Sequence, residues 1–339
     1  TATLWYSMNV ACWYGLLRVV QRELLTVDDP SVRERGTLAA ALLIFPIAID
    51  GFLLGSFHML VMFLTVAGLT DVWHGRSWRG GLLLGAGVWL KLLPIFGVGY
   101  LLLKRRWKAA AIALVCAVTI DATLSVAAYG WKTGWQEHAL WLSQGAVGTA
   151  TRQMEEEKSN DEDRITNQST MVIVRRFFNE RAGFPQLTLI DLSPTALAVM
   201  QLSALAGLGG VVLWLLRRPA SELRPEDWAA EISIVLLTTL WFSPVVWSYH
   251  FTAAFPAIAL LMARQDHEAS KRTTAVVWII AGACFAIPLA RAGGHMLWAT
   301  LFIGGQVALL DWQRTELNSD ALSNRSRKSS PLASRRAAV

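Results

Sequence analysis

The sequence predicts an all-α fold, a polytopic transmembrane helical bundle with one outer polar loop region. Hydrophobic residues make up 54% of the 339 positions and charged residues only 17%. Apolar stretches of about 20 residues, the length with which a helix crosses a bilayer, recur along the chain. Short clusters of Lys and Arg separate these stretches. A water-soluble globule of this size could not bury so much apolar surface, so the chain is expected to lie in a membrane.

The charge balance and the cysteines narrow the classes of protein further. The formal net charge is +6, from 31 basic and 25 acidic residues. In a membrane protein such an excess is typical of basic cytoplasmic loops, so we expect membrane lipids and no nucleic acid as partners. The three cysteines lie inside apolar runs, which predicts small buried side chains and no redox or metal site. The composition excludes a disordered, collagen-like or coiled-coil chain.

The order of apolar stretches and basic clusters predicts the topology. If all basic clusters are cytoplasmic, each stretch between two of them crosses the membrane an even number of times. Residues 37–69 and 229–263 then form hairpins that turn outside, and residues 80–103 are too short for two full spans at about 1.5 Å per residue. Residues 80–103 should therefore form a pair of broken helices. The stretches are 2–20, 37–69, 80–103, 109–129, 194–216, 229–263, 274–289 and 295–310.

The same topology predicts one membrane domain over residues 1–310, which includes an outer loop at 130–193. Residues 311–339 form a basic cytoplasmic tail that we expect to be disordered. The first stretch must enter from outside to reach the basic cluster near Arg22, and residue 1 is a Thr. We therefore expect a longer chain with one or more spans upstream. Polar residues of the outer turns collect on one face: Asp50, His58, Lys91, Asn167, His250 and His295.

Lys91 is the first candidate for a functional residue because it interrupts an apolar run and precedes Pro94. An ammonium group in hydrocarbon costs about 2.5–3.5 kcal/mol, so it needs compensation. A lipid phosphate at the outer interface would supply it, and the break at Pro94 would let the backbone face the anion. The alternative is a lysine that reaches to the interface at a helix end.

Two further motifs fall on the outer face. Asn167 and Gln168 offer donors and acceptors for sugar hydroxyls, and Arg175 and Arg176 suit a phosphate. Their alternatives are a glycosylation sequon and a lipid headgroup contact. The run 243–251 holds Trp247, Tyr249 and His250 in the middle of a hydrophobic hairpin. Trp and Tyr can belong to an interfacial belt, whereas an imidazole there can bond a phosphate oxygen or a hydroxyl.

The acidic run 155–163 contains Asp161-Glu162-Asp163, which resembles a metal clamp. Six acidic residues mixed with Lys158 and Asn160 are more typical of a solvated loop, so we expect no metal site.

Three motifs in one order resemble glycosyltransferase family 87, over about residues 5–310. They are Gly85, Lys91 and Pro94 before the basic end 104–107, Asn-Gln-Ser at 167–169 with a downstream Arg, and Ser243-Pro244-x-x-Trp247-x-x-His250. The family comprises bacterial membrane mannosyltransferases of the C-superfamily. The resemblance implies an outer active site, an inverting transfer from a polyprenyl-phosphate sugar to a lipid or glycan acceptor, and no cofactor or metal. It also implies that the general base is an acidic residue in the first outer loop.

We therefore predict a hexosyltransferase of the plasma membrane, with mannose as the expected sugar. His250 and, with less weight, Asp50 are the candidate catalytic residues. The donor and its phosphate should be bound by Lys91, Arg175, Arg176, Asn167, Gln168, Trp247, Tyr249 and His58. His58 stands where the family usually shows Asn, which bears on donor or acceptor preference. The alternative is a lipid or glycolipid transporter, which would show internal repeats around a midplane site.

Overall fold

The computed structural model describes residues 2–140, 143, 166–180, 186–264, 268–284 and 286–310. The acidic run 155–163 and the basic tail 311–339 lie outside these residues. No strand occurs in the described part, so the prediction of an all-α fold is confirmed.

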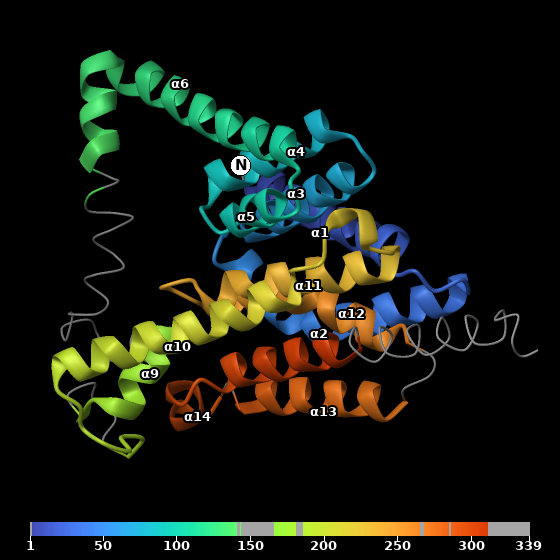
Figure 1. Ribbon diagram of the computed structural model, residues 1–339, viewed down its shortest axis with the longest axis vertical. Helices are drawn as coiled ribbons and strands as arrows, with labels where there is room; N and C mark the ends of the chain where they lie inside the picture. The colour runs from blue at the N-terminus through green and yellow to red at the C-terminus, as the bar shows by residue number, and fades with distance from the viewer. Residues whose placement is uncertain are drawn as a thin grey trace, which may run out of the picture.

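The helices follow the order of the apolar stretches (Figure 1). The first half of the chain forms α1 (Ala2–Val19) with a π-helical end η1 (Val20–Leu24), α2 (Pro30–Leu53), α3 (His58–Trp73), α4 (Ser77–Leu90), α5 (Ile95–Leu103) and α6 (Trp107–Leu140). The second half forms α9 (Thr170–Phe178), α10 (Pro194–Leu215), η4 (Ala220–Glu222), α11 (Pro225–Trp241), η5 (Ser248–Ala254), α12 (Phe255–Met262), α13 (Glu268–Cys284), α14 (Pro288–Ala292) and a last helix, His295–Leu310.

The helix breaks lie where the sequence predicts them. The turn between α2 and α3 covers residues 54–57, α4 and α5 are separated at Lys91–Pro94, and irregular backbone and the 3₁₀ helix η5 follow α11. The first hairpin, predicted over residues 37–69, starts earlier than expected because Asp29 caps α2. Its Oδ1 accepts the Ser31 N–H at 2.8 Å, and Pro30 occupies the first turn.

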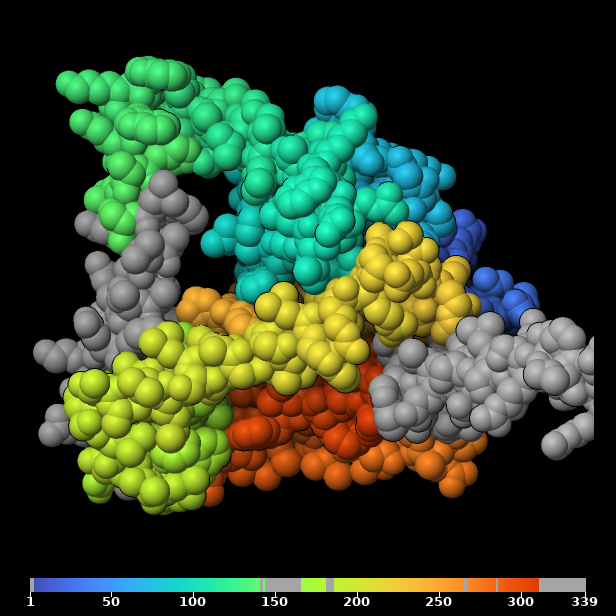
Figure 2. Space-filling model, in the orientation of Figure 1, coloured from blue at the N-terminus to red at the C-terminus, as the bar shows by residue number. Residues whose placement is uncertain are grey.

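The predicted outer loop is less irregular than expected. α6 continues past residue 129 to Leu140, with a break at Gly130, whose φ of 75° suits a residue without a Cβ. Residues 170–178 form α9, which begins where the Ser169 hydroxyl accepts the Val172 N–H at 3.3 Å. α6 stands apart from α9 and α10, and the surface between them is hollowed (Figure 2).

The chain is a membrane protein by its helices. α2, α6 and α10 are each long and apolar enough to cross a bilayer, and α3, residues 248–262 and the last helix are shorter apolar segments. Large apolar side chains point outward from these helices, among them Leu42 (65% exposed) and Val115 (65% exposed). Such outward faces suit a lipid environment and not water.

Small residues bring α3, α4 and α6 into close contact. A Cβ added at Gly80 would lie 2.5 Å from the Gly68 carbonyl oxygen, and one at Gly85 would lie 2.5 Å from that of Ala113. Because only glycine fits these positions, α4 is held between its two neighbours. The helix ends at Lys91, so this packing also fixes the base of the lysine side chain.

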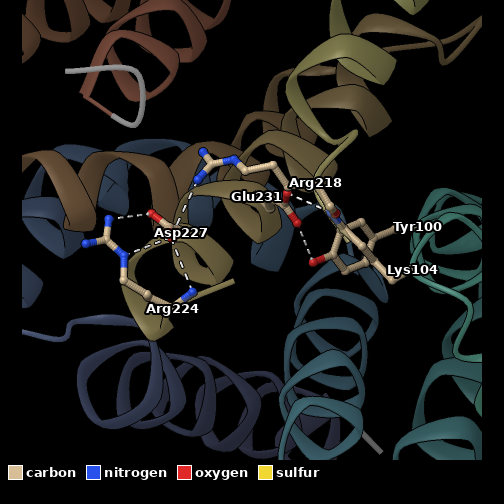
Figure 3. A network of polar contacts seen from close by, with 6 residues as sticks. All are labelled: Tyr100, Lys104, Arg218, Arg224, Asp227 and Glu231. Atoms are coloured by element: carbon tan, nitrogen blue, oxygen red, sulfur yellow. Dashed lines mark hydrogen bonds and ion pairs between the residues drawn. The ribbon is translucent and has the colours of Figure 1, made fainter. Parts of the chain in front are cut away.

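A buried polar network joins α5 to α10 and α11 (Figure 3). The Lys104 ammonium donates to Glu231 Oε1 at 2.7 Å, to the Leu216 carbonyl at 2.8 Å and to the Arg218 carbonyl. Tyr100 donates its hydroxyl to Glu231 Oε2 at 2.8 Å. The side chains of Lys104 and Glu231 are only 2% and 4% exposed. The neighbouring Asp227 carboxylate binds the Arg224 and Arg218 guanidinium groups at 3.1 and 3.5 Å.

Removing one partner of this pair should destabilise the fold strongly. Glu231→Met leaves the Lys104 ammonium buried without its counter-charge, which typically costs about 3–5 kcal/mol. Lys104→Met together with Glu231→Met should cost less than the sum of the two single changes, because the pair then disappears as a unit. The check is a double-mutant cycle on unfolding in detergent micelles.

The pair Glu268–Lys271 at the surface, with a similar distance of 2.8 Å, supplies the control. Glu268→Gln should leave unfolding unchanged, because solvent screens that pair. Equal effects of Glu231→Met and Glu268→Gln would contradict the assignment of the buried pair.

Candidate functional site

Lys91 lies at the break between α4 and α5. Its backbone is extended, with φ −159° and ψ 131°, and its N–H closes the last turn of α4 on the Gly87 carbonyl at 3.0 Å. Pro94 starts α5 and ends the hydrogen-bonded ladder between the two helices. The ammonium group contacts the His250 Nε2 atom and lies 5.1 Å from the centroid of the Tyr249 ring. The lysine therefore points into the bundle toward η5.

The backbone fixes the imidazole of His250. Its Nδ1 accepts the Trp247 N–H at 2.9 Å, and the residue is 3% exposed. A neutral imidazole whose Nδ1 accepts carries its proton on Nε2. That Nε2–H faces the Lys91 ammonium, so two hydrogen-bond donors meet. An oxygen with two lone pairs placed against both groups would satisfy them, and a phosphate oxygen is such an acceptor.

Asp50, His58 and Tyr249 surround this pair. The His58 and His250 ring centroids are 5.1 Å apart, and the Tyr249 ring lies 4.5 Å from that of His250. Asp50, near the end of α2, accepts the hydroxyl of Ser248. A Cβ at Gly51 would lie 3.0 Å from the Tyr249 Cβ, so glycine lets α2 approach η5 closely. Five residues singled out in the sequence thus form one cluster, although their roles stay predictions.

Asn167 and Gln168 bind main-chain groups, and those of Asn167 include Val246, next to Trp247 in the chain. Asn167 Oδ1 accepts the N–H groups of Ser169 and Val246, both at 3.0 Å, and its Nδ2 donates to the Pro244 carbonyl at 3.3 Å. Gln168 Nε2 donates to the Arg291 carbonyl at 3.1 Å, and its Oε1 accepts the Met296 N–H at 3.2 Å. These amides fasten the start of α9 to two turns. Their sugar-binding role stays a prediction.

The two arginines of α9 differ in their surroundings. Arg176 is 2% exposed and donates from Nη1 to the Ala292 carbonyl at 3.0 Å. Burial lowers the pKa of Arg176 to about 10, so the guanidinium stays charged at neutral pH. Arg175 is half-buried on the same helix. Trp247 serves the site through its main-chain N–H, which holds His250, a contribution that a sequence cannot display.

Sequence reasoning missed three residues near the cluster. Ser248, which holds Asp50, and the pair Trp5 and Asn9 on α1 received no role. Asn9 had a detectable signal, because it is an amide in the middle of the apolar stretch 2–20. No three His, Cys, Asp or Glu side chains gather as a metal site within the described residues. The acidic run 155–163 lies outside them.

The fold and the motifs define a membrane glycosyltransferase class. The profile of glycosyltransferase family 87 matches residues 1–244, and the chain belongs to this family. The prediction of this family from the three motifs is therefore confirmed.

Two similar proteins carry the same name, polyprenol-phosphate-mannose-dependent alpha-(1-2)-phosphatidylinositol pentamannoside mannosyltransferase. The one from Mycolicibacterium smegmatis is 29% identical over 267 residues, which cover 77% of this chain and 55% of the relative. The one from Mycobacterium tuberculosis is 26% identical over 328 residues, which cover 92% of this chain and 67% of the relative. A phosphatidylinositol mannoside mannosyltransferase from the same species is 27% identical over 62% of the chain and 42% of its own length. The chain thus spans about half of the first relative, and no solved structure matches it.

Proposed function

We propose that this protein transfers mannose from a polyprenyl-phosphate donor to a hydroxyl group of a glycolipid acceptor on the extracytoplasmic side of the plasma membrane. Family membership and the names of the relatives support the reaction class. The observation that carries the proposal is the contact between Lys91 and His250, two donors aimed at the same point inside a membrane protein. A phosphate monoanion or diester anion suits this arrangement better than a neutral ligand.

In the proposed reaction the bond between the sugar C1 and the phosphate oxygen breaks, and polyprenyl phosphate leaves. Negative charge grows on the phosphate in the transition state, where Lys91 and the Nε2–H of His250 would stabilise it. The acceptor oxygen attacks C1 from the opposite face, so a single displacement inverts the anomeric centre. A carboxylate takes the acceptor proton.

Two carboxylates are candidates for that base. Asp50, held by Ser248, is the acidic side chain that the fold brings beside Tyr249 and η5. The resemblance to the family favours an acidic residue in the first outer loop, and we give Asp50 less weight.

Neutralising Lys91 should abolish transfer without loss of the fold. Lys91→Met removes a charge from an apolar setting, so the protein should insert and unfold as the wild type does. Transfer of labelled mannose from polyprenyl-phosphate mannose into lipid should fall by about 10²-fold or more, the typical cost of losing one charge-stabilising group. Lys91→Arg should keep part of the activity, and His250→Gln should lose activity to a similar extent as Lys91→Met.

Lys108→Met is the matched control, because Lys108 is an exposed lysine near the start of α6. Normal activity of Lys91→Met would assign this lysine to an interfacial contact. A wild-type protein that moves the donor across the membrane but forms no mannosylated product would favour the transporter alternative.

Activity should persist in EDTA. The protein's own cations would neutralise the phosphate charge, a task that a divalent ion performs in many nucleotide-sugar enzymes. Wild-type protein should therefore transfer mannose equally well with EDTA and with added Mn²⁺, and alanine at both Asp161 and Asp163 should matter little. Loss of transfer in EDTA, with rescue by Mn²⁺ in the wild type only, would contradict this and assign the acidic run a metal.

The proposed outer face can be checked by thiol labelling. Leu189 is 70% exposed in the predicted outer region, and Trp107 is 61% exposed in the basic segment predicted to be cytoplasmic. In a background without Cys12, Cys116 and Cys284, Leu189→Cys should react with an impermeant maleimide in intact cells. Trp107→Cys should react only after permeabilisation. Labelling of Trp107→Cys but not of Leu189→Cys in intact cells would assign the site to the cytoplasmic side.

A further inference from the structure

One face of α1 carries a stripe of three residues, Trp5, Asn9 and Trp13, at successive helical turns. Trp5 packs edge-on against Phe57 of the α2–α3 turn, with ring centroids 4.4 Å apart. Trp13 packs on Phe255, the first residue of α12, at 5.1 Å. Asn9 lies on α1 between these two contacts, on the helix that packs against α3.

Several buried polar atoms on α1 and at the start of α3 lack a regular hydrogen-bond partner among the described residues. Asn9 is fully buried, and its Nδ2 donates to the Trp5 carbonyl at 3.0 Å. Its Oδ1, the Nε1–H of Trp5 and both ring nitrogens of His58 are buried and make no hydrogen bond of regular geometry with the described part of the chain. The main chain of His250 makes a looser hydrogen-bond contact with the His58 ring, so this ring has one polar neighbour. Buried polar atoms in native proteins normally have partners, so several such atoms together indicate a bound molecule.

The chemistry of these atoms indicates what that molecule is. Trp5 offers a hydrogen-bond donor and Asn9 an acceptor, and a neutral imidazole at His58 can offer either. This set of side chains is therefore uncharged. An anion would be better served by Lys91, and a cation by Asp50. A hydroxyl group both donates and accepts, and the rings of Trp5, Phe57 and His58 add apolar faces. A neutral polyol therefore matches this set.

We propose that Trp5, Asn9 and His58 form a subsite for sugar hydroxyls beside the Lys91–His250 pair. The inference rests on the proposed function, because it is the transferase reaction that brings two sugars to this place. The hydroxyls come from either the donor mannose or the acceptor glycan. His58 links the subsite to the pair, since its ring lies 5.1 Å from that of His250.

Binding to the resting protein tests the subsite apart from catalysis. The probe is octyl α-D-mannopyranoside, titrated against detergent-solubilised full chain and measured by calorimetry. Asn9→Leu and His58→Phe should each weaken binding by about tenfold, the loss expected for one hydrogen bond. Both variants should unfold near the wild-type temperature, because the burial of an apolar side chain in place of a partly satisfied polar one offsets the lost contacts of Asn9 Nδ2 and the His58 ring. Asn9→Ser keeps a polar side chain, so it should weaken probe binding less than Asn9→Leu does.

Thr274→Val is the matched control. Thr274 on α13 is also fully buried, and its Oγ1 also lacks a partner among the described residues, but it lies outside the stripe. It should bind the probe as the wild type does. Unchanged probe affinity in both Asn9→Leu and His58→Phe would overturn the subsite, whatever the transfer assay shows.

Steady-state kinetics then identify the source of the hydroxyls. A rise in KM for the mannosyl acceptor alone assigns the subsite to the acceptor, and a rise in KM for polyprenyl-phosphate mannose alone assigns it to the donor sugar. A fall in kcat with both KM values unchanged would contradict the proposal. A wild-type protein that binds the probe but transfers nothing would refute the proposed function and leave the subsite standing.

Discussion

The buried ion pair between Lys104 and Glu231 is the contact on which the geometry of the site depends. It joins the end of α5 to the first half of α11, and the same ammonium also binds the carbonyl that ends α10. Lys91 lies four residues before the other end of α5, a nine-residue helix that is about 14 Å long at 1.5 Å per residue. His250 follows α11. If α5 slipped against α11 by one helical turn, about 5.4 Å, the Lys91 ammonium and the His250 Nε2–H would no longer be in contact. Phe96 and Phe242, with ring centroids 5.9 Å apart, hold the same two segments between these points.

The two helix breaks, at Lys91 and at η5, position the side chains of Lys91 and His250. The 3₁₀ turn at η5 directs the Trp247 N–H to His250, so a main-chain atom selects the tautomer of a side chain. The extended backbone of Lys91 lets its side chain leave the axis of α4. Irregular backbone inside a membrane is tolerated where protein surrounds it or where it lines a cavity, and here the side chains of Lys91 and His250 from the two breaks contact each other. The lysine and the imidazole are thus fixed before a ligand arrives, which lowers the cost of binding it.

The sequence predicted the breaks and the gathering of Asp50, His58, Lys91 and His250, because these depend on local signals. A charge or a Pro in an apolar run marks a break, and the parity of the spans places the turns on one face. Lys104 was interpreted as one more basic marker of the cytoplasmic side, and its pairing with Glu231, 127 positions away, depends on the packing of α5 against α11. The amides of Asn167 and Gln168 looked suited to a sugar, but the structure directs them to carbonyl and N–H groups of two distant turns. Hydrogen-bonding capacity is a property of the residue, whereas the partner is a property of the fold.

This distinction explains why the unpaired atoms of α1 carry more information than the paired ones of α9. Asn9 and Asn167 are the same residue type, and both are buried. The amide oxygen of Asn167 accepts two backbone N–H groups, so it has a structural task that the fold already completes. The oxygen of Asn9 is buried without a hydrogen-bond partner among the described residues, on the face of α1 between the Trp5–Phe57 and Trp13–Phe255 contacts. Lys91 and His250 present two donors, of which the lysine is charged, and this pair favours an anion. The neutral set of Trp5, Asn9 and His58 favours hydroxyl groups. A sugar phosphate carries both kinds of group on one molecule, so adjacent sites of these two kinds are the arrangement that such a donor and its acceptor require.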